Sequence, residues 1–214
     1  MPSTLVHVAL AALVATALLG DRLDGRSLAV VLLAVIVVDL DVFVGLAVTG
    51  AHRAAFHTLV WPALAAAALV YDTAVRDRSA LAARVGDGAP RLAWTTVAAV
   101  VFAAIGPDLV TNGVNVLYPV HDQFYALNGD VLLSSDRGVV QSFVAEADRG
   151  STGQRQYYTG VDPDPTSEGA EAVTGDETPE RVFPIVESGV QLLIVVSGSV
   201  VTAARMWDVR RTGT

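Results

Sequence analysis

The chain has 214 residues, of which 52% are hydrophobic and 17% are charged, and its formal net charge is −8. Such an apolar composition excludes an ordinary soluble domain and favours a small polytopic membrane protein. The absence of cysteine excludes disulfides, thiolate metal sites and cysteine nucleophiles, and the absence of a visible basic patch argues against nucleic-acid binding.

Hydropathy predicts about five membrane-spanning helices, so the expected fold is an all-α polytopic membrane protein in contact with membrane lipid. The apolar segments are 3–20, 28–50, 54–71, 92–112 and 183–204. The third is short and contains Pro62, and Gly106-Pro107 is expected to kink or end the fourth. The first segment has an alternative interpretation as a signal peptide, because Ala15-Thr16-Ala17 resembles a cleavage site. Its start, however, lacks the basic residue that signal peptides carry.

The distribution of arginine predicts the orientation in the membrane. Nine arginines fall in the loops 21–27 and 72–91 and in the C-terminal tail, which lie on one side if there are five spans. The short loop on the other side holds only Arg53. The positive-inside rule therefore places the N-terminus outside and the C-terminus in the cytoplasm of a multi-pass protein of the cell membrane.

The predicted organisation has four parts. They are a four-helix membrane region (1–112), an extracytoplasmic loop with a β-hairpin (113–161), an acidic disordered linker (162–182), and a last transmembrane helix with a short tail (183–214). Turn signals at Asn128-Gly129 and at 136–138 separate the expected strands, and a further strand is expected at 154–161. Residues 111–182 carry 12 acidic residues against 4 arginines. This acidic, lysine-free composition is typical of salt-adapted proteins such as those of halophilic archaea.

Ionisable side chains interrupt the second apolar segment and follow it directly. Asp39 and Asp41 lie inside the segment, and His52, Arg53 and His57 come just after it. A carboxylate in hydrocarbon costs several kcal/mol unless it is paired, protonated or bound to a metal. Carboxylates beside imidazoles are the ligand types that Zn²⁺, Mn²⁺ and Fe²⁺ prefer. The pattern therefore predicts a metal site inside a membrane protein.

The helical rise places polar groups of four helices at a similar depth in the outer leaflet. At about 1.5 Å per residue, His7, His57 and Asp108 fall in the outer parts of their spans. Asp39 and Asp41 fall at or beyond the midplane on the same side. This convergence predicts one shared site. Asp39 and Asp41, however, are about 200° apart around a regular helix. Either the helix is locally unwound, or Asp41 contributes to the site and Asp39 supports it.

The combination of motifs resembles the YdjM-like family of membrane-bound metal-dependent hydrolases, which are inner-membrane-associated. The family has an early histidine, a Pro-Asp-x-Asp motif, an HR…H segment and a later His-x-x-x-Asp motif followed by Gly and Tyr-Pro. The matching positions are His7, Asp39, Asp41, His52, Arg53, His57, Asp108, Gly113, Tyr118 and Pro119. Val38 replaces the proline of the second motif, and Ala104 stands where the later histidine is expected. The resemblance covers roughly residues 1–125 and implies hydrolysis, with either His121 substituting for the missing histidine or a degenerate site.

The expected roles follow from a catalytic site with three protein ligands and an open position. The ligands are drawn from His7, Asp41, His57 and Asp108. Asp39 or His52 acts as a base or supports a ligand, Arg53 clamps a substrate phosphate or pairs with an aspartate, and His121 supports a ligand or is solvated. Asp108 is equally well explained as a helix N-cap. His52 and His57 have an alternative interpretation as an interfacial pair, over which metal binding is favoured.

The leading functional hypothesis is a divalent-metal-dependent hydrolase at the outer membrane face, with zinc favoured over manganese or iron. A phosphoester or lipid-linked substrate suits this location. The alternative is a non-catalytic membrane protein with a structural metal or polar site and an acidic outer surface that binds a partner. An ion transporter ranks last, because the inner halves of the spans carry almost no polar residues.

Overall fold

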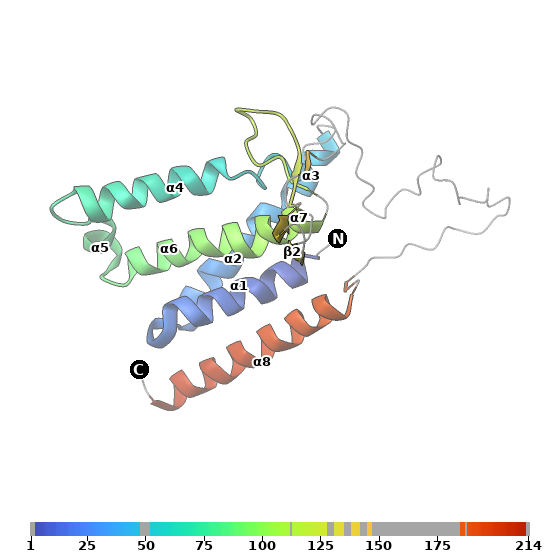
Figure 1. Ribbon diagram of the computed structural model, residues 1–214. Helices are drawn as coiled ribbons and strands as arrows, with labels where there is room; N and C mark the ends of the chain where they lie inside the picture. Colours follow the sequence, from blue (N-terminus) through green and yellow to red (C-terminus); the bar gives the residue numbers. More distant parts are fainter. Residues whose placement is uncertain are drawn as a thin grey trace, which may run out of the picture.

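The computed structural model of the protein describes residues 3–47, 52–111, 113–127, 131–134, 138–141, 145–146, 185–186 and 188–212 (Figure 1). Four predictions for the outer loop lie wholly or partly outside these residues. They are the acidic linker at 162–182, the strand at 154–161, the turn at Asn128-Gly129 and the turn at 136–138, of which only Gly138 is described.

Long apolar helices form the body of the molecule. Helices α1 (Thr4–Leu19), α2 (Gly25–Asp39), α6 (Ala89–Ala99) and α8 (Gly189–Thr212) run alongside one another (Figure 1). With the short segments that continue them, four helices of 19 to 23 residues are long and apolar enough to cross a membrane. The predicted all-α membrane architecture is thereby confirmed at this level, whereas the orientation stays a prediction.

The third predicted span differs from the other four. Helix α4 (Val60–Val70) and its continuation η2 (Tyr71–Val75) form an apolar helix of only 16 residues. The residues before Val60, which are predicted to begin this span, instead form an irregular loop at 52–59. The helix starts late because the backbone of this loop is hydrogen-bonded to the segment after α7 (Gly106–Thr111) and carries the polar side chains described below. A short helix, α5 (Ala80–Val85), follows at the other end of the bundle.

Helix α1 is the centre of the bundle because it is apolar on every side. Its small residues Ala11 and Ala15 pack against Ala103 and Ala104, in a core completed by aliphatic side chains of α2 such as Val35. Helix α8 crosses the opposite side of α1. There, a Cβ added at Gly198 would lie 2.7 Å from the carbonyl oxygen of Ala9. Close crossings of this kind between small residues hold membrane helices together without a hydrophobic driving force.

Two interruptions of the long helices shape the end of the bundle that carries the N-terminus. A turn at Leu40 separates α2 from α3 (Asp41–Ala47). Between α6 and α7 (Gly106–Thr111) lies a π-helical segment, η3 (Val100–Ile105). Pro107 cannot donate a helical hydrogen bond, and the wider turn lets the helix continue through it. The helix therefore does not end at Gly106-Pro107, and the π-segment lies inside a continuous 23-residue helix.

The loop after α7 contains the expected strands. β2 (Val131–Ser134) pairs antiparallel with β3 (Gly138–Gln141), and β1 (Tyr125–Ala126) pairs antiparallel with β4 (Ala145–Glu146). The described strands all fall within the segment predicted to carry a hairpin. A turn of 3₁₀ helix, η1 (Gly20–Arg22), links α1 to α2.

Candidate metal centre

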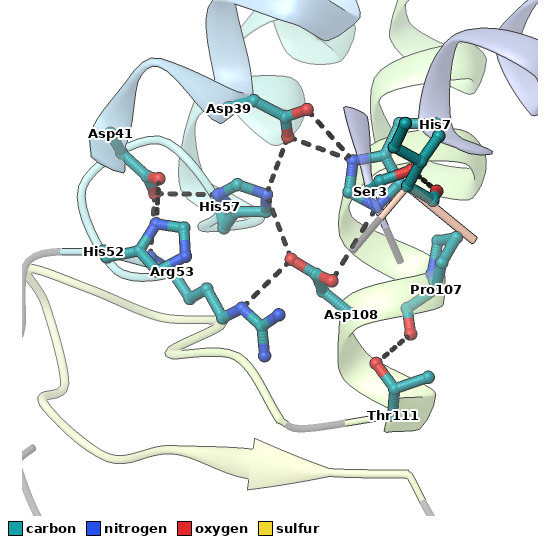
Figure 2. Close-up of polar contacts among 11 residues, drawn as sticks. Ser3, His7, Asp39, Asp41, His52, Arg53, His57, Pro107, Asp108 and Thr111 are labelled. Carbon is teal, nitrogen blue, oxygen red and sulfur yellow. Dashed lines mark hydrogen bonds and ion pairs between the residues drawn. The ribbon is translucent and has the colours of Figure 1, made fainter. Parts of the chain in front are cut away.

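Polar side chains from four parts of the chain meet at one end of the bundle (Figure 2). His7 comes from α1, Asp39 and Asp41 from the two sides of the Leu40 turn, the basic residues from the loop 52–59, and Asp108 from α7. Five of these residues are each at most 2% exposed: His7, Asp41, Arg53, His57 and Asp108. This density of buried ionisable groups needs compensation by pairing or by a bound ion.

The turn at Leu40 allows two aspartates that are two residues apart in the sequence to reach one site. Because α2 ends at Asp39 and α3 begins at Asp41, the two side chains are not constrained to opposite faces of one helix. Both contact His57: Asp39 Oδ1 lies 3.4 Å from Nε2, and Asp41 Oδ2 lies 2.7 Å from Nδ1. The local unwinding considered from the sequence is therefore what the structure has.

Each of the two buried histidines is oriented by one aspartate. Nδ1 of His7 lies 3.0 Å from Oδ1 of Asp39, and Nδ1 of His57 lies 2.7 Å from Oδ2 of Asp41. A carboxylate only accepts hydrogen bonds, so Nδ1 carries the proton in both rings. In the neutral imidazoles this leaves the lone pair on Nε2, the arrangement in which a histidine binds a metal while a carboxylate holds its other nitrogen.

The two Nε2 atoms face the same carboxylate. Nε2 of His7 lies 3.7 Å from Oδ1 of Asp108, and Nε2 of His57 lies 3.3 Å from Oδ2 of the same residue. Within the described residues, neither Nε2 atom makes a hydrogen bond, and neither does Oδ1 of Asp108, although all three are buried. Buried polar atoms without a hydrogen bond need an explanation, and a shared divalent ion would supply one.

The donor set fits a divalent ion. His7, Asp39 and His57 each offer one ligand atom, and these atoms all lie within 4.8 Å of one another. Metal–ligand bonds of about 2.0–2.1 Å in a tetrahedron separate neighbouring ligand atoms by about 3.3–3.4 Å. The contacts of Nε2 of His57 with Asp39 and Asp108, at 3.4 and 3.3 Å, match this separation. Imidazole nitrogens with carboxylate oxygens suit Zn²⁺, Mn²⁺ or Fe²⁺.

Asp41 and Asp39 are placed differently from the roles expected from the sequence. Asp39, expected to support a ligand, belongs to the tight group, whereas Asp41, expected to be a ligand, lies behind His57. Asp41 also accepts from Nδ1 of His52 at 2.8 Å and from the backbone N–H of Arg53 at 2.9 Å. His52 therefore contacts the group through Asp41. Which residues bind the metal stays a prediction.

Arg53 occupies an unusual backbone position. Its φ of 63° is in the left-handed region, which a side-chain-bearing residue rarely adopts, and its carbonyl accepts from the backbone N–H of Asn115 at 3.0 Å. Nε of its buried guanidinium lies 3.3 Å from Oδ2 of Asp108. A strained residue held this way indicates that the position of the loop 52–59 is specified by the site it completes.

The segment after α7 clamps this loop, which the sequence did not predict. Val116 accepts from the backbone N–H of Leu59 at 2.8 Å and from the hydroxyl of Thr58 at 3.0 Å. Asn115 is fully buried, and its amide nitrogen donates to Asp122 at 2.6 Å. The signal available in the sequence is the polar stretch TNGVNVLYP, in which Asn115 lies.

His121 and Ala104, which the sequence singled out, lie apart from the cluster. His121 is exposed on the loop after α7, with its ring centre 6.3 Å from that of Tyr125. Ala104 is fully buried in the apolar core, one helical turn before Asp108. In the resembling family, a histidine is expected at the position of Ala104. The structure does not bring His121 to that position.

Comparison of the chain with protein-family models, with curated proteins and with solved structures found no match. The fold and the candidate site are therefore interpreted from their own geometry, and the resemblance to the YdjM-like hydrolases stays a prediction.

Proposed function

We propose that the protein is a membrane-embedded hydrolase that depends on a divalent metal ion. The observation that carries this proposal is the pair of buried imidazoles, each held at Nδ1 by an aspartate and each presenting an Nε2 without a hydrogen bond. His7, Asp39 and His57 would hold the ion, with Asp108 as the neighbouring carboxylate. Zinc is the favoured ion, and manganese and iron also suit these ligands.

The chain's own residues would orient and charge the site. When bound, a divalent ion supplies Lewis acidity and makes water acidic enough to act as a nucleophile near neutral pH. Asp41 holds the ring of His57, and His52 lies against the same carboxylate, where it can take up or release a proton. The guanidinium of Arg53, next to Asp108, favours an anionic group beside the ligands. These charges suit a phosphoester.

Hydrolysis of bis(p-nitrophenyl) phosphate by purified, reconstituted protein tests this proposal. We expect turnover that chelation removes and that Zn²⁺, Mn²⁺ or Fe²⁺ restores. His57→Ala should reduce the rate to the uncatalysed level, whereas His121→Ala, on the exposed loop, should retain it. Turnover that survives both chelation and His57→Ala would contradict a metal-dependent mechanism.

A second candidate function is a structural metal site without catalysis. The observation that favours it is the apolar packing of Ala104 in the core. The family that the chain resembles has a histidine at this position. One ligand fewer would leave a site that binds metal but does not complete a catalytic centre. In that case the metal would raise the unfolding temperature of the protein, and no phosphoester would be turned over.

A further inference from the structure

An apolar pocket opens next to the candidate metal centre, between α2, α4 and α6. Its volume is about 430 Å³, within the range of small-molecule sites. Its walls include Val37 and Val38 of α2, Phe56 and Trp61 around the start of α4, and Val97 and Val100 at the junction of α6 and η3. Among the described lining residues, the polar groups of the side chains are the hydroxyl of Thr96 and the indole N–H of Trp61, which donates to the carbonyl of Ala55.

Two residues that line the pocket are sequence neighbours of residues in the polar cluster. Val38 directly precedes Asp39, and Phe56 directly precedes His57. From this level the pocket extends along the helices toward the middle of the bundle. Thr96 lies twelve residues before Asp108 in the same continuous helix, which corresponds to roughly 18 Å of helical rise. A molecule in the pocket would thus lie parallel to the helices with one end at the cluster.

The pocket is open to the side where lipid would surround the bundle. Trp61 and Val37 are 53% and 52% exposed, although both are large apolar residues. A helix of about 10–12 Å diameter is too wide for a cavity of this size, whereas a single hydrocarbon chain suits its length and its apolar lining. A lipid in one leaflet has this arrangement, with a polar head at the surface and a chain that points to the midplane.

We propose that this pocket receives the hydrocarbon chain of a lipid-linked phosphoester whose head group lies at the His/Asp cluster. The inference rests on the proposed function and names the substrate class of that site. Within a membrane, lipid tails are as apolar as the pocket, so a chain gains little by entering it. Occupancy must therefore depend on the head group, and a divalent ion at the cluster, together with Arg53 beside Asp108, would favour an anionic one.

The test uses the full chain in phosphatidylcholine nanodiscs with a phosphatidic acid that carries a diazirine at the end of one acyl chain. After irradiation, we expect the label on the α4 and α6 residues that line the pocket, and excess untagged phosphatidic acid should compete for it. Ala65→Trp fills the pocket and should reduce this labelling at least about tenfold. Ala63→Trp, at an exposed position of α4 outside the lining, should not.

A second probe carries the same tagged chain on an uncharged diacylglycerol. The proposal predicts much weaker labelling of the pocket by this probe. Labelling that is equal for the two head groups, or that spreads evenly over the lipid-facing residues and ignores Ala65→Trp, overturns the inference.

Turnover of the water-soluble bis(p-nitrophenyl) phosphate separates this inference from the proposed function. Ala63→Trp, outside the pocket lining, should leave that turnover and the metal content unchanged. If head-group-dependent labelling occurs without any turnover of the soluble ester, the pocket binds an anionic lipid but hydrolysis is contradicted. If turnover occurs without specific labelling, hydrolysis stands and the lipid-linked substrate is contradicted.

Discussion

The side chain of Asp41 connects the interrupted second helix to the loop 52–59. Its oxygens accept hydrogen bonds from Nδ1 of His52, from the backbone N–H of Arg53 and from Nδ1 of His57. Asp41 is fully buried, so water could not take its place as the acceptor if its side chain were removed. Three N–H groups would then lose their hydrogen-bond acceptor. Asp41 therefore fixes the orientation of His57 without belonging to the tight group of ligand atoms.

The variant Asp41→Asn tests this positioning role. In asparagine, an NH₂ group replaces one of the two carboxylate oxygens. This donor would face one of the N–H groups that now donate to Asp41, and the hydrogen bond would be lost. We expect the affinity for zinc to fall about 10–100-fold, as measured by chelator competition, with little change in helix content. The control is Asp77→Asn, which lies on an exposed segment far from the cluster. An unchanged affinity in Asp41→Asn would mean that His57 does not depend on Asp41.

At the residue scale, the members of the cluster were predictable and their roles were not. Charged and imidazole side chains stand out inside apolar segments, and a constant rise per residue gives their depth. The placement of Asp39 in the tight group depends on the turn at Leu40, and leucine is a good helix former that gives no sign of a break. The left-handed backbone of Arg53 likewise has no signal in its residue type.

At the scale of elements, α2 begins with a reciprocal cap whose acidic member, Asp24, lies just before the candidate span. The backbone N–H of Ser27 donates to Oδ1 of Asp24 at 2.6 Å, and the backbone N–H of Asp24 donates to Oγ of Ser27 at 2.8 Å. The hydrogen bond from the Ser27 backbone is the main reason why the pKa of Asp24 lies below 3.8, its ordinary value. Because the folded-state pKa is the lower one, the cap stabilises the fold fully above 3.8 and loses this effect as the pH falls through the folded-state pKa.

The variant Asp24→Ala should reveal this pH dependence. At pH 7 we expect it to lower the free energy of unfolding by about 1 kcal/mol, the usual effect of removing an N-cap. The deficit relative to the unsubstituted protein should shrink as the pH is lowered below 3.8, because the cap of the unsubstituted protein weakens there. Unfolding in mixed micelles at several pH values measures both effects. A deficit that stays constant down to pH 2 would show that the charge of Asp24 contributes nothing to the cap.

Element types were easier to predict than element ends. The four long helices follow from their apolar length alone, because each must satisfy its backbone internally to cross a bilayer. The late start of α4 depends on hydrogen bonds between the loop 52–59 and residues around Val116, which are distant in sequence. The π-segment η3 replaces the break expected at Pro107, since the sequence does not show whether a helix ends at a proline or widens before it.

At the scale of the whole molecule, the cluster and the chain between α4 and α6 lie at opposite ends of the bundle. In Figure 1, α3 and α7 mark one end, and α5 and the C-terminus mark the other. The short helix made of α4 and η2 must therefore cross the membrane for the predicted orientation to hold, although it has only 16 residues. A short span is accommodated by local thinning of the bilayer.

Labelling of single cysteines tests this topology, because the chain contains no cysteine of its own. In intact cells, we expect a membrane-impermeant maleimide to label His121→Cys, at the end that carries the cluster. Arg78→Cys, between η2 and α5, should be labelled only after permeabilisation. Labelling of both positions from the same side would mean that the short helix does not cross, and the predicted orientation would be wrong.

The most direct test of the central claim is the metal content of the purified protein, measured by elemental mass spectrometry after purification without chelator. The claim is that His7, Asp39 and His57, with Asp108 beside them, hold one divalent ion. It predicts close to one equivalent of zinc, manganese or iron per chain, retained in His121→Ala and lost when His7→Ala and His57→Ala are combined. Absence of bound metal in the unsubstituted protein, or metal that survives the double substitution, would contradict it and leave the cluster as a buried polar network.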